Sequence, residues 1–147
     1  MLVRAALVVA AAAVIVFAAT RLHKVDVCHD AKNAALAVGL GHPPPGGAAQ
    51  LSTKIVDNCR DSSDVAAAGA AISRGGDLAV AEHLTRTAVS RDPSAYVAWT
   101  ALAIVLTRRN KPAASRAAAR RAVALNPRYA AARQLAAPAR AVAPSGP

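Results

Sequence analysis

The two cysteines, Cys28 and Cys59, are the residues of this 147-residue chain with the clearest capacity for covalent chemistry. Cys28 lies near the start of a predicted helix over residues 27–40, and Cys59 near the end of a predicted helix over residues 48–60. A Pro/Gly-rich turn at 41–47 joins these helices, so they should run antiparallel. Because both thiols fall on apolar helix faces, we expect a Cys28–Cys59 disulfide that closes the hairpin.

Two other uses of these thiols remain open. Buried free thiols would fit a reducing compartment, and Cys28, His29 and Cys59 could supply metal ligands, although the paired spacing typical of zinc sites is absent. A thiol-redox protein would require an exposed cysteine of low pKa, and neither cysteine sits in a C-x-x-C context. An even cysteine pair favours an oxidising, extracytoplasmic location.

The remaining polar residues show no pattern typical of catalysis. The four histidines are scattered, and none has a plausible catalytic neighbour in the sequence. A hydrolase-type serine motif, a Gly-rich phosphate loop and a carboxylate pair on one helix face are all absent from the sequence. We therefore predict a protein that is not an enzyme and that needs no cofactor or metal.

The N-terminal segment, 1–20, contains the most hydrophobic stretch. No residue from 5 to 20 is charged, and Arg4 and Arg21 flank this run. As a helix it would span about 24 Å, slightly short of a ~30 Å hydrocarbon core unless the arginines snorkel outward. We predict either a transmembrane signal anchor over 1–20, with the remainder extracytoplasmic, or a signal peptide cleaved after Ala18, which would give a secreted protein.

Charge is unevenly distributed along the chain. The formal net charge is +10, but no Asp or Glu follows Pro93, so the excess lies in the C-terminal third. This cluster could contact phospholipid head groups, an anionic wall polymer or an acidic protein face, or it could be a solvated helix face. Nucleic acid is not expected for an extracytoplasmic domain. The expected basic patch comprises Arg109, Arg116, Arg120, Arg121 and Arg128.

Composition and turn signals predict paired helices. Hydrophobic residues make up 54% of the chain and aromatic residues only 3%, because alanine dominates, so we expect close helix packing around a thin core. Gly75-Gly76 separates predicted helices at 62–74 and 77–91. The dipeptides at 92–93 and 126–127 are interpreted as capped helix starts, and their separation of about 34 residues is the period of a two-helix repeat. A capping helix over 130–137 and a disordered tail over 138–147 follow.

This spacing resembles the tetratricopeptide repeat family. The family pattern of a large aromatic, a leucine and a small residue matches Trp99, Leu102 and Ala103, and the small residue and proline of its second helix match Ala119 and Pro127. The repeats cover 62–95, which lacks the aromatic, and 96–129. The resemblance implies a helical-hairpin solenoid with residues 26–60 as a divergent first repeat. The earlier copy consists of Val65, Ala68, Gly69, Ile72, Ala81, Ala88 and Pro93.

The family consists of binding scaffolds, so the resemblance implies a non-catalytic adaptor for an unidentified protein partner. We therefore expect an all-α protein, anchored to the membrane by its N-terminal helix, that mediates protein–protein interaction on the extracytoplasmic side. The alternative is a secreted or surface-bound protein whose basic C-terminal helices bind a polyanion or anionic lipid. By resemblance, the groove is lined by first-helix residues: Arg74, Val97, Thr100, Ile104, Thr107 and Arg108.

Overall fold

The computed structural model describes residues 2–42 and 45–137, with side chains described from Ala10 onward. These residues form seven α-helices and no strand, which confirms the predicted all-α class. The predicted tail at 138–147 lies outside the described residues. The helices are α1 (Leu2–Gly39), α2 (Gly47–Asn58), α3 (Ser62–Arg74), α4 (Leu78–Arg91), α5 (Tyr96–Arg108), α6 (Pro112–Leu125) and α7 (Ala130–Ala136).

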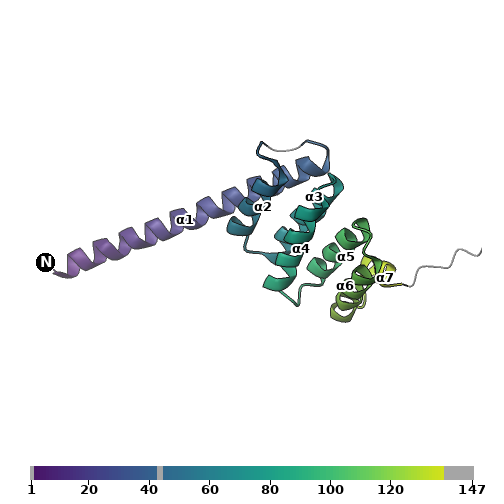
Figure 1. The fold of residues 1–147 in the computed structure, drawn as a ribbon. Coiled ribbons are helices and arrows are strands. Elements are labelled where there is room, and N and C mark those ends of the chain that lie inside the picture. The colour runs from purple at the N-terminus through teal and green to yellow at the C-terminus, as the bar shows by residue number, and fades with distance from the viewer. Residues whose placement is uncertain (1, 43–44, 138–147) are drawn as a thin grey trace, which may run out of the picture.

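The helices stack as successive pairs in two layers (Figure 1). Helix α3 packs against α1, α4 and α5, and α5 in turn packs against α6 and α7, so the odd-numbered helices form one layer. Helices α3, α5 and α7 begin at Ser62, Tyr96 and Ala130, and α4 and α6 begin at Leu78 and Pro112. Equivalent helices therefore start at the same interval each time, about 34 residues. The result is a short helical solenoid.

Small residues make the closest contacts between helices. Ala35, Gly69 and Ala103 recur at the repeat interval on α1, α3 and α5, and all three are buried. A Cβ atom added at Gly69 would lie 2.9 Å from Cγ2 of Thr85 and 3.1 Å from the carbonyl oxygen of Ala81. Helices α3 and α4 therefore approach too closely for an alanine at that position.

Local side-chain chemistry sets several of the helix boundaries. The side chain of Asp61 accepts a hydrogen bond from the backbone N–H of Ser63 at 2.7 Å, and that of Asp77 accepts one from Val80 at 3.3 Å. Both bonds satisfy N–H groups that have no partner within the helix. Pro112 is the first residue of α6, where no donor is needed.

The two proline dipeptides at 92–93 and 126–127 do not begin helices, so that prediction was wrong. Asp92 is the C-cap of α4, and α5 begins only at Tyr96. The Asp92 side chain accepts a hydrogen bond from the backbone N–H of Ser94 at 2.9 Å, which forms a turn before the helix. Asn126 makes the equivalent 3.2 Å bond with Arg128 ahead of α7.

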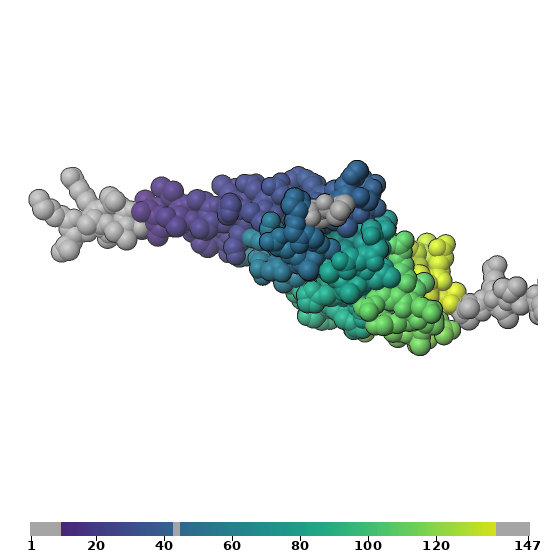
Figure 2. All heavy atoms as spheres, turned by 45° about the horizontal axis from the view of Figure 1, so that its top comes forward, coloured from purple at the N-terminus to yellow at the C-terminus, as the bar shows by residue number. Residues whose placement is uncertain are grey.

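Helix α1 is continuous through two segments that were predicted separately, at 1–20 and 27–40. No Gly or Pro interrupts the sequence between them. Every described residue from Ala10 to Asp26 is exposed, and this part of α1 projects from the body (Figures 1 and 2). Among the described residues, no helix combines the length and apolar character that a bilayer crossing requires. The predicted anchor lies partly outside the residues whose side chains are described.

Candidate interaction surfaces

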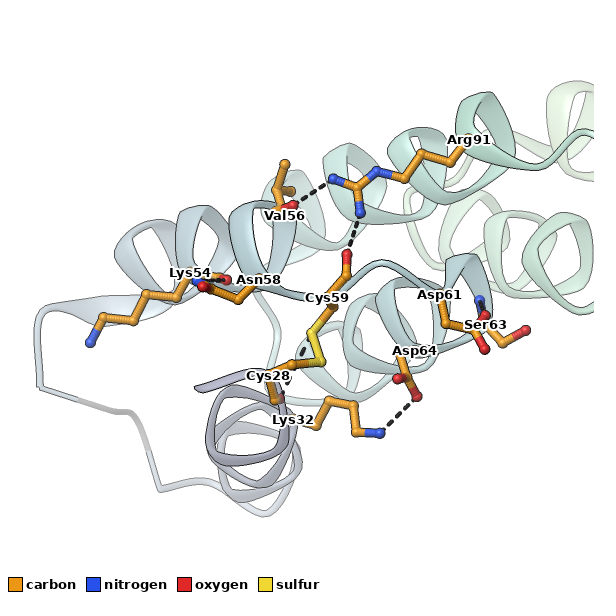
Figure 3. Close-up of a disulfide and its surroundings, with 10 residues drawn as sticks. All are labelled: Cys28, Lys32, Lys54, Val56, Asn58, Cys59, Asp61, Ser63, Asp64 and Arg91. Carbon is orange, nitrogen blue, oxygen red and sulfur yellow. Dashed lines mark hydrogen bonds and ion pairs between the residues drawn. A yellow bond between two sulfur atoms is a disulfide. The ribbon is translucent and has the colours of Figure 1, made fainter. Parts of the chain in front are cut away.

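Cys28 and Cys59 form the predicted disulfide (Figure 3). Their Cα atoms lie 5.0 Å apart, and the bond joins α1, where it enters the body, to the residue that caps the end of α2. Both cysteines are buried. The bond closes a loop between residues separated by 31 positions, which restricts the unfolded chain. The thiols are therefore used structurally rather than as metal ligands.

Arg91 of α4 contacts the end of α2 beside this disulfide. Its guanidinium donates a 2.6 Å hydrogen bond to the carbonyl oxygen of Cys59 and another to that of Val56 (Figure 3). A cation at this position satisfies the free carbonyls at the end of α2 and opposes the negative end of its dipole. This contact was not predicted from the sequence.

Arg108 of α5 makes the corresponding contact at the end of α3. It donates a 2.6 Å hydrogen bond to the carbonyl oxygen of Ser73, although the sequence analysis assigned Arg108 only to the groove. Arg91 and Val56, and likewise Arg108 and Ser73, are separated by 35 residues. This separation, close to one repeat length, is a signal in the sequence that could have revealed both contacts.

The predicted groove residues are not equally available to a partner. Thr100 is only 3% exposed and donates to the carbonyl oxygen of Tyr96, so its prediction as a contact residue was wrong. Residues that face an adjacent helix become buried when the helices stack. The family pattern alone does not show which of the first-helix residues these are. Val97 is partly buried, and the exposed members are Arg74, Ile104, Thr107 and Arg108.

Two large apolar side chains are exposed at equivalent positions of the odd-numbered helices. Leu36 on α1 is 51% exposed and Ile104 on α5 is 38% exposed. Leu36, Ala70 and Ile104 follow one another at the repeat interval, on α1, α3 and α5. Leu36 and Ala67 also line a cavity of about 130 Å³. The sequence analysis missed Leu36 because it placed the groove on 62–129. We call Leu36, Ala67, Ala70 and Ile104 the odd-helix face.

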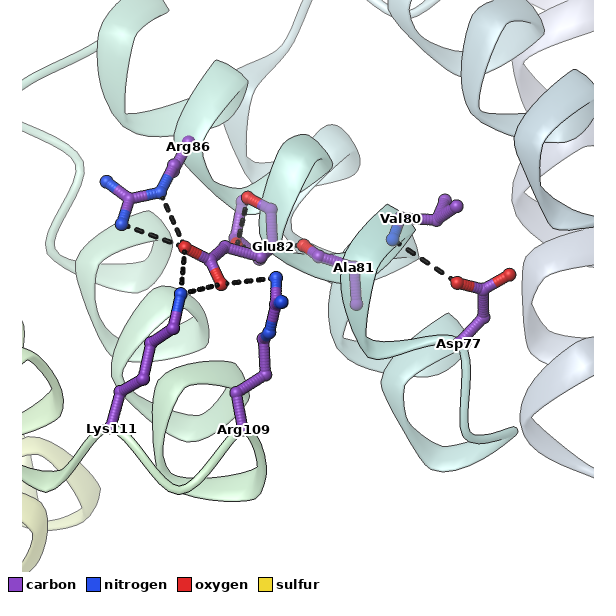
Figure 4. A network of polar contacts seen from close by, with 8 residues as sticks. Asp77, Val80, Ala81, Glu82, Arg86, Arg109 and Lys111 are labelled. Carbon is purple, nitrogen blue, oxygen red and sulfur yellow. Dashed lines mark hydrogen bonds and ion pairs between the residues drawn. The ribbon is translucent and has the colours of Figure 1, made fainter.

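Glu82 of α4 is a buried carboxylate at the junction between the two predicted repeats (Figure 4). It accepts hydrogen bonds from Arg109 at 2.7 Å, Lys111 at 3.0 Å and Arg86 at 2.9 Å. Burial acts to raise the pKa of Glu82, but the hydrogen bonds from Lys111 and Arg86 and the charge of Arg109 outweigh it, so the pKa lies below its usual 4.5. Arg109 is therefore ion-paired rather than part of a free basic patch.

The rest of the predicted basic patch lies on the surface. Four arginines are exposed and make no ion pair with any described residue: Arg116, Arg120, Arg121 and Arg128. The first three lie on α6, in the even layer, and the fourth lies in the turn before α7. Most of the basic patch thus lies on the even layer, whereas Leu36 and Ile104 are exposed on the odd layer.

No family model matches this chain, and no curated protein matches its sequence. Function is therefore inferred from the surfaces of the protein itself.

Proposed function

We propose that this protein is a non-catalytic scaffold of the tetratricopeptide type whose odd-helix face binds an apolar segment of a partner protein. The observation that supports it most directly is the exposure of Leu36 and Ile104 at matching positions of the odd layer. Exposed apolar side chains that recur on one face of a solenoid are typical of a binding surface. The interval of about 34 residues between helix starts is also the repeat length of that family.

The spacing of the odd layer sets the size of the partner segment. Helices α1 and α5 are two packing steps apart, and each step between packed helices is about 8–10 Å. A segment that contacts both Leu36 and Ile104 must therefore span roughly 20 Å, which corresponds to about 13 residues as a helix. Arg74 and Arg108 are exposed near the end of this face and favour a partner segment that carries acidic residues.

We further propose that the start of α1 anchors this scaffold in a membrane. Val14, Ile15, Val16 and Phe17 are 58–68% exposed, and they belong to the uncharged run between Arg4 and Arg21. An exposed apolar helix of this kind is stabilised by lipid. The Cys28–Cys59 disulfide favours the extracytoplasmic side, because oxidising compartments preserve such bonds.

Site-specific photocrosslinking in intact cells tests the binding surface. A crosslinking amino acid at position 36 or 104 should capture a discrete protein partner, because these side chains point outward from the odd layer. Ala117, exposed on α6, is the matched control position and should capture none. Capture from position 117 alone, or equally from all three positions, would contradict the assignment.

A second candidate function uses the four exposed arginines of α6 and of the turn that follows it. Their lack of acidic partners among the described residues favours contact with a polyanion, either anionic lipid or a wall polymer. Binding of residues 21–147 to vesicles should then rise with anionic lipid and fall with salt. Equal binding to neutral vesicles would exclude this function.

A further inference from the structure

A cavity lies beside the disulfide, at the base of the projecting part of α1. It has a volume of about 490 Å³ and is formed by α1 together with the connection between α2 and α3. Arg21, Lys24 and Lys32 line it from α1, and Arg60 lines it from the connection, while Val25 supplies an apolar wall. Its volume is within the range of small-molecule sites. We call it the α1 cavity.

The two carboxylates that line the α1 cavity are already engaged. Asp64 accepts a 2.7 Å hydrogen bond from Lys32, and Asp61 accepts one from the backbone N–H of Ser63 (Figure 3). Lys24 and Arg60, by contrast, form no ion pair with any described residue, and Arg21 lies over the Phe17 ring. The cavity therefore has more cationic than anionic groups, and two of its cations are available to an anionic ligand.

The position of the α1 cavity along α1 matches the head-group layer of a bilayer. Arg21 and Lys24 follow the last residue of the uncharged run by one and four positions, which is about 2 and 6 Å along a helix. The head-group layer on each side of the hydrocarbon is roughly 5–8 Å deep. If the uncharged run occupies the hydrocarbon, both cations lie at the depth of the lipid phosphates.

We propose that the α1 cavity binds the phosphate head group of an anionic phospholipid, with Lys24 and Arg60 donating to the phosphate oxygens. Charge-assisted hydrogen bonds from lysine and arginine are strong contacts for phosphate. The exposed Phe17, inside the uncharged run, places apolar surface where the acyl chains would begin. This inference rests on the membrane anchoring proposed above and assigns lipid recognition to this cavity rather than to α6.

Native mass spectrometry of the purified full-length chain tests this site, with phosphatidylglycerol and phosphatidylcholine supplied together. Phosphatidylglycerol adducts should predominate, and Lys24→Gln/Arg60→Gln should lower their ratio to phosphatidylcholine adducts, by about fivefold for each cation removed. The matched control Lys54→Gln/Arg133→Gln removes the same charge from exposed positions on α2 and α7 and should leave the ratio unchanged. An unchanged ratio in the first variant, or equal losses in both, would overturn the proposal.

Two further measurements separate the possible failures. Soluble glycerol 3-phosphate, titrated by calorimetry, should bind far more weakly than the lipid, and equally tight binding would overturn the lipid assignment. Alkaline carbonate extraction tests the anchor independently. A chain that stays in the membrane but shows no phosphatidylglycerol preference contradicts the head-group site alone, whereas a chain released by carbonate contradicts the anchor and the lipid assignment together.

Discussion

Helices α1–α4 and helices α5–α7 repeat the same two-layer packing, yet polar and covalent links concentrate in the first group. The Cys28–Cys59 disulfide, the Lys32–Asp64 ion pair and the contacts of Arg91 with the end of α2 all belong to α1–α4. In α5–α7, the packing depends on Ala103, Leu106 and their alanine neighbours, and the polar contacts are neutral hydrogen bonds of Ser115 with Thr107 and with the carbonyl oxygen of Ala103. All eight acidic residues lie at or before Asp92, so α5–α7 has no carboxylate for such links.

The two groups of helices differ in how their helices are packed. In α5–α7 each helix packs against the other two, and small side chains allow this close approach. Helix α1, by contrast, leaves the body at Cys28 and projects beyond it, and α2 follows a longer turn. Alanine packing and neutral hydrogen bonds therefore join the helices inside the stack, whereas the end at which α1 leaves the body also has a disulfide and charged contacts.

The largest predicted effect is removal of the disulfide. Cys28→Ser/Cys59→Ser should lower the free energy of unfolding by about 3–4 kcal/mol, because a loop of this length is no longer closed in the unfolded chain. Hydrogen exchange should show that α2 loses protection while α5 and α6 keep theirs. Reduction of the wild-type bond is the control and should reproduce this pattern. Uniform loss of protection in both groups of helices would contradict the comparison.

The next effect concerns Glu82, which links the two groups. Glu82→Gln should lower the free energy of unfolding by about 2–3 kcal/mol, because the charged hydrogen bonds to Arg109, Lys111 and Arg86 are weakened. Asp57→Asn, at an exposed position on α2, is the matched control and should have an effect below about 0.5 kcal/mol. Chemical denaturation of each variant provides the measurement. Equal effects of the two substitutions would exclude a linking role for Glu82.

The effect of Glu82 should depend on pH. A carboxyl whose pKa is lowered in the folded state stabilises the protein above its unfolded pKa, here near 4.5, and this contribution is lost as the pH falls through the folded value. The stability difference between wild type and Glu82→Gln should therefore stay constant from neutral pH down to about pH 5 and shrink below about pH 4.5. A difference that grows on acidification would contradict the lowered pKa.

A smaller effect concerns the close contact between α3 and α4 at Gly69. Gly69 faces Thr85 between α3 and α4, whereas Ala103 and Ala119 occupy the equivalent positions of α5 and α6. Gly69→Ala should lower stability by about 1–2 kcal/mol through overpacking. Adding Thr85→Ala removes the nearest atom, so the double variant should be more stable than the sum of the two single changes predicts. Strict additivity in thermal unfolding would contradict this contact.

The smallest effect concerns the arginines of α6. Arg116 and Arg120 are four positions apart on one helix, and like charges at this spacing repel each other. Arg120→Gln should therefore stabilise the protein by a few tenths of a kcal/mol at low salt, and the gain should disappear at high salt. Thermal unfolding at two ionic strengths provides the measurement. A loss of stability would indicate that Arg120 has a favourable partner.

Much of this architecture could be predicted because local signals act within single helices and turns. Asp61, Asp77 and Pro112 set helix boundaries through local effects on the backbone, and the Pro/Gly-rich turn predicted at 41–47 implied that Cys28 and Cys59 meet, as they do. The turn at Asp92 was misread because aspartate before proline suits both a helix start and a turn that precedes one.

The surfaces were harder to predict because they depend on contacts between distant residues. Arg109 belongs to a run of basic residues in the sequence, and only the packing of α5 on α4 brings it to Glu82. The burial of Thr100 likewise depends on packing between helices. The α1 cavity combines Lys24 with Arg60, which are separated by a hairpin, so its cationic lining is not visible as a local pattern.

The continuity of α1 has a mechanical consequence. Because one unbroken helix runs from Leu2 to Gly39, any rotation of the N-terminal segment about the helix axis also rotates the body. Each residue of an α-helix turns the chain by about 100°, so one residue inserted near position 23 would swing the odd-helix face about 100° around this axis. The number of residues in the projecting part of α1 therefore sets the direction in which the odd-helix face points.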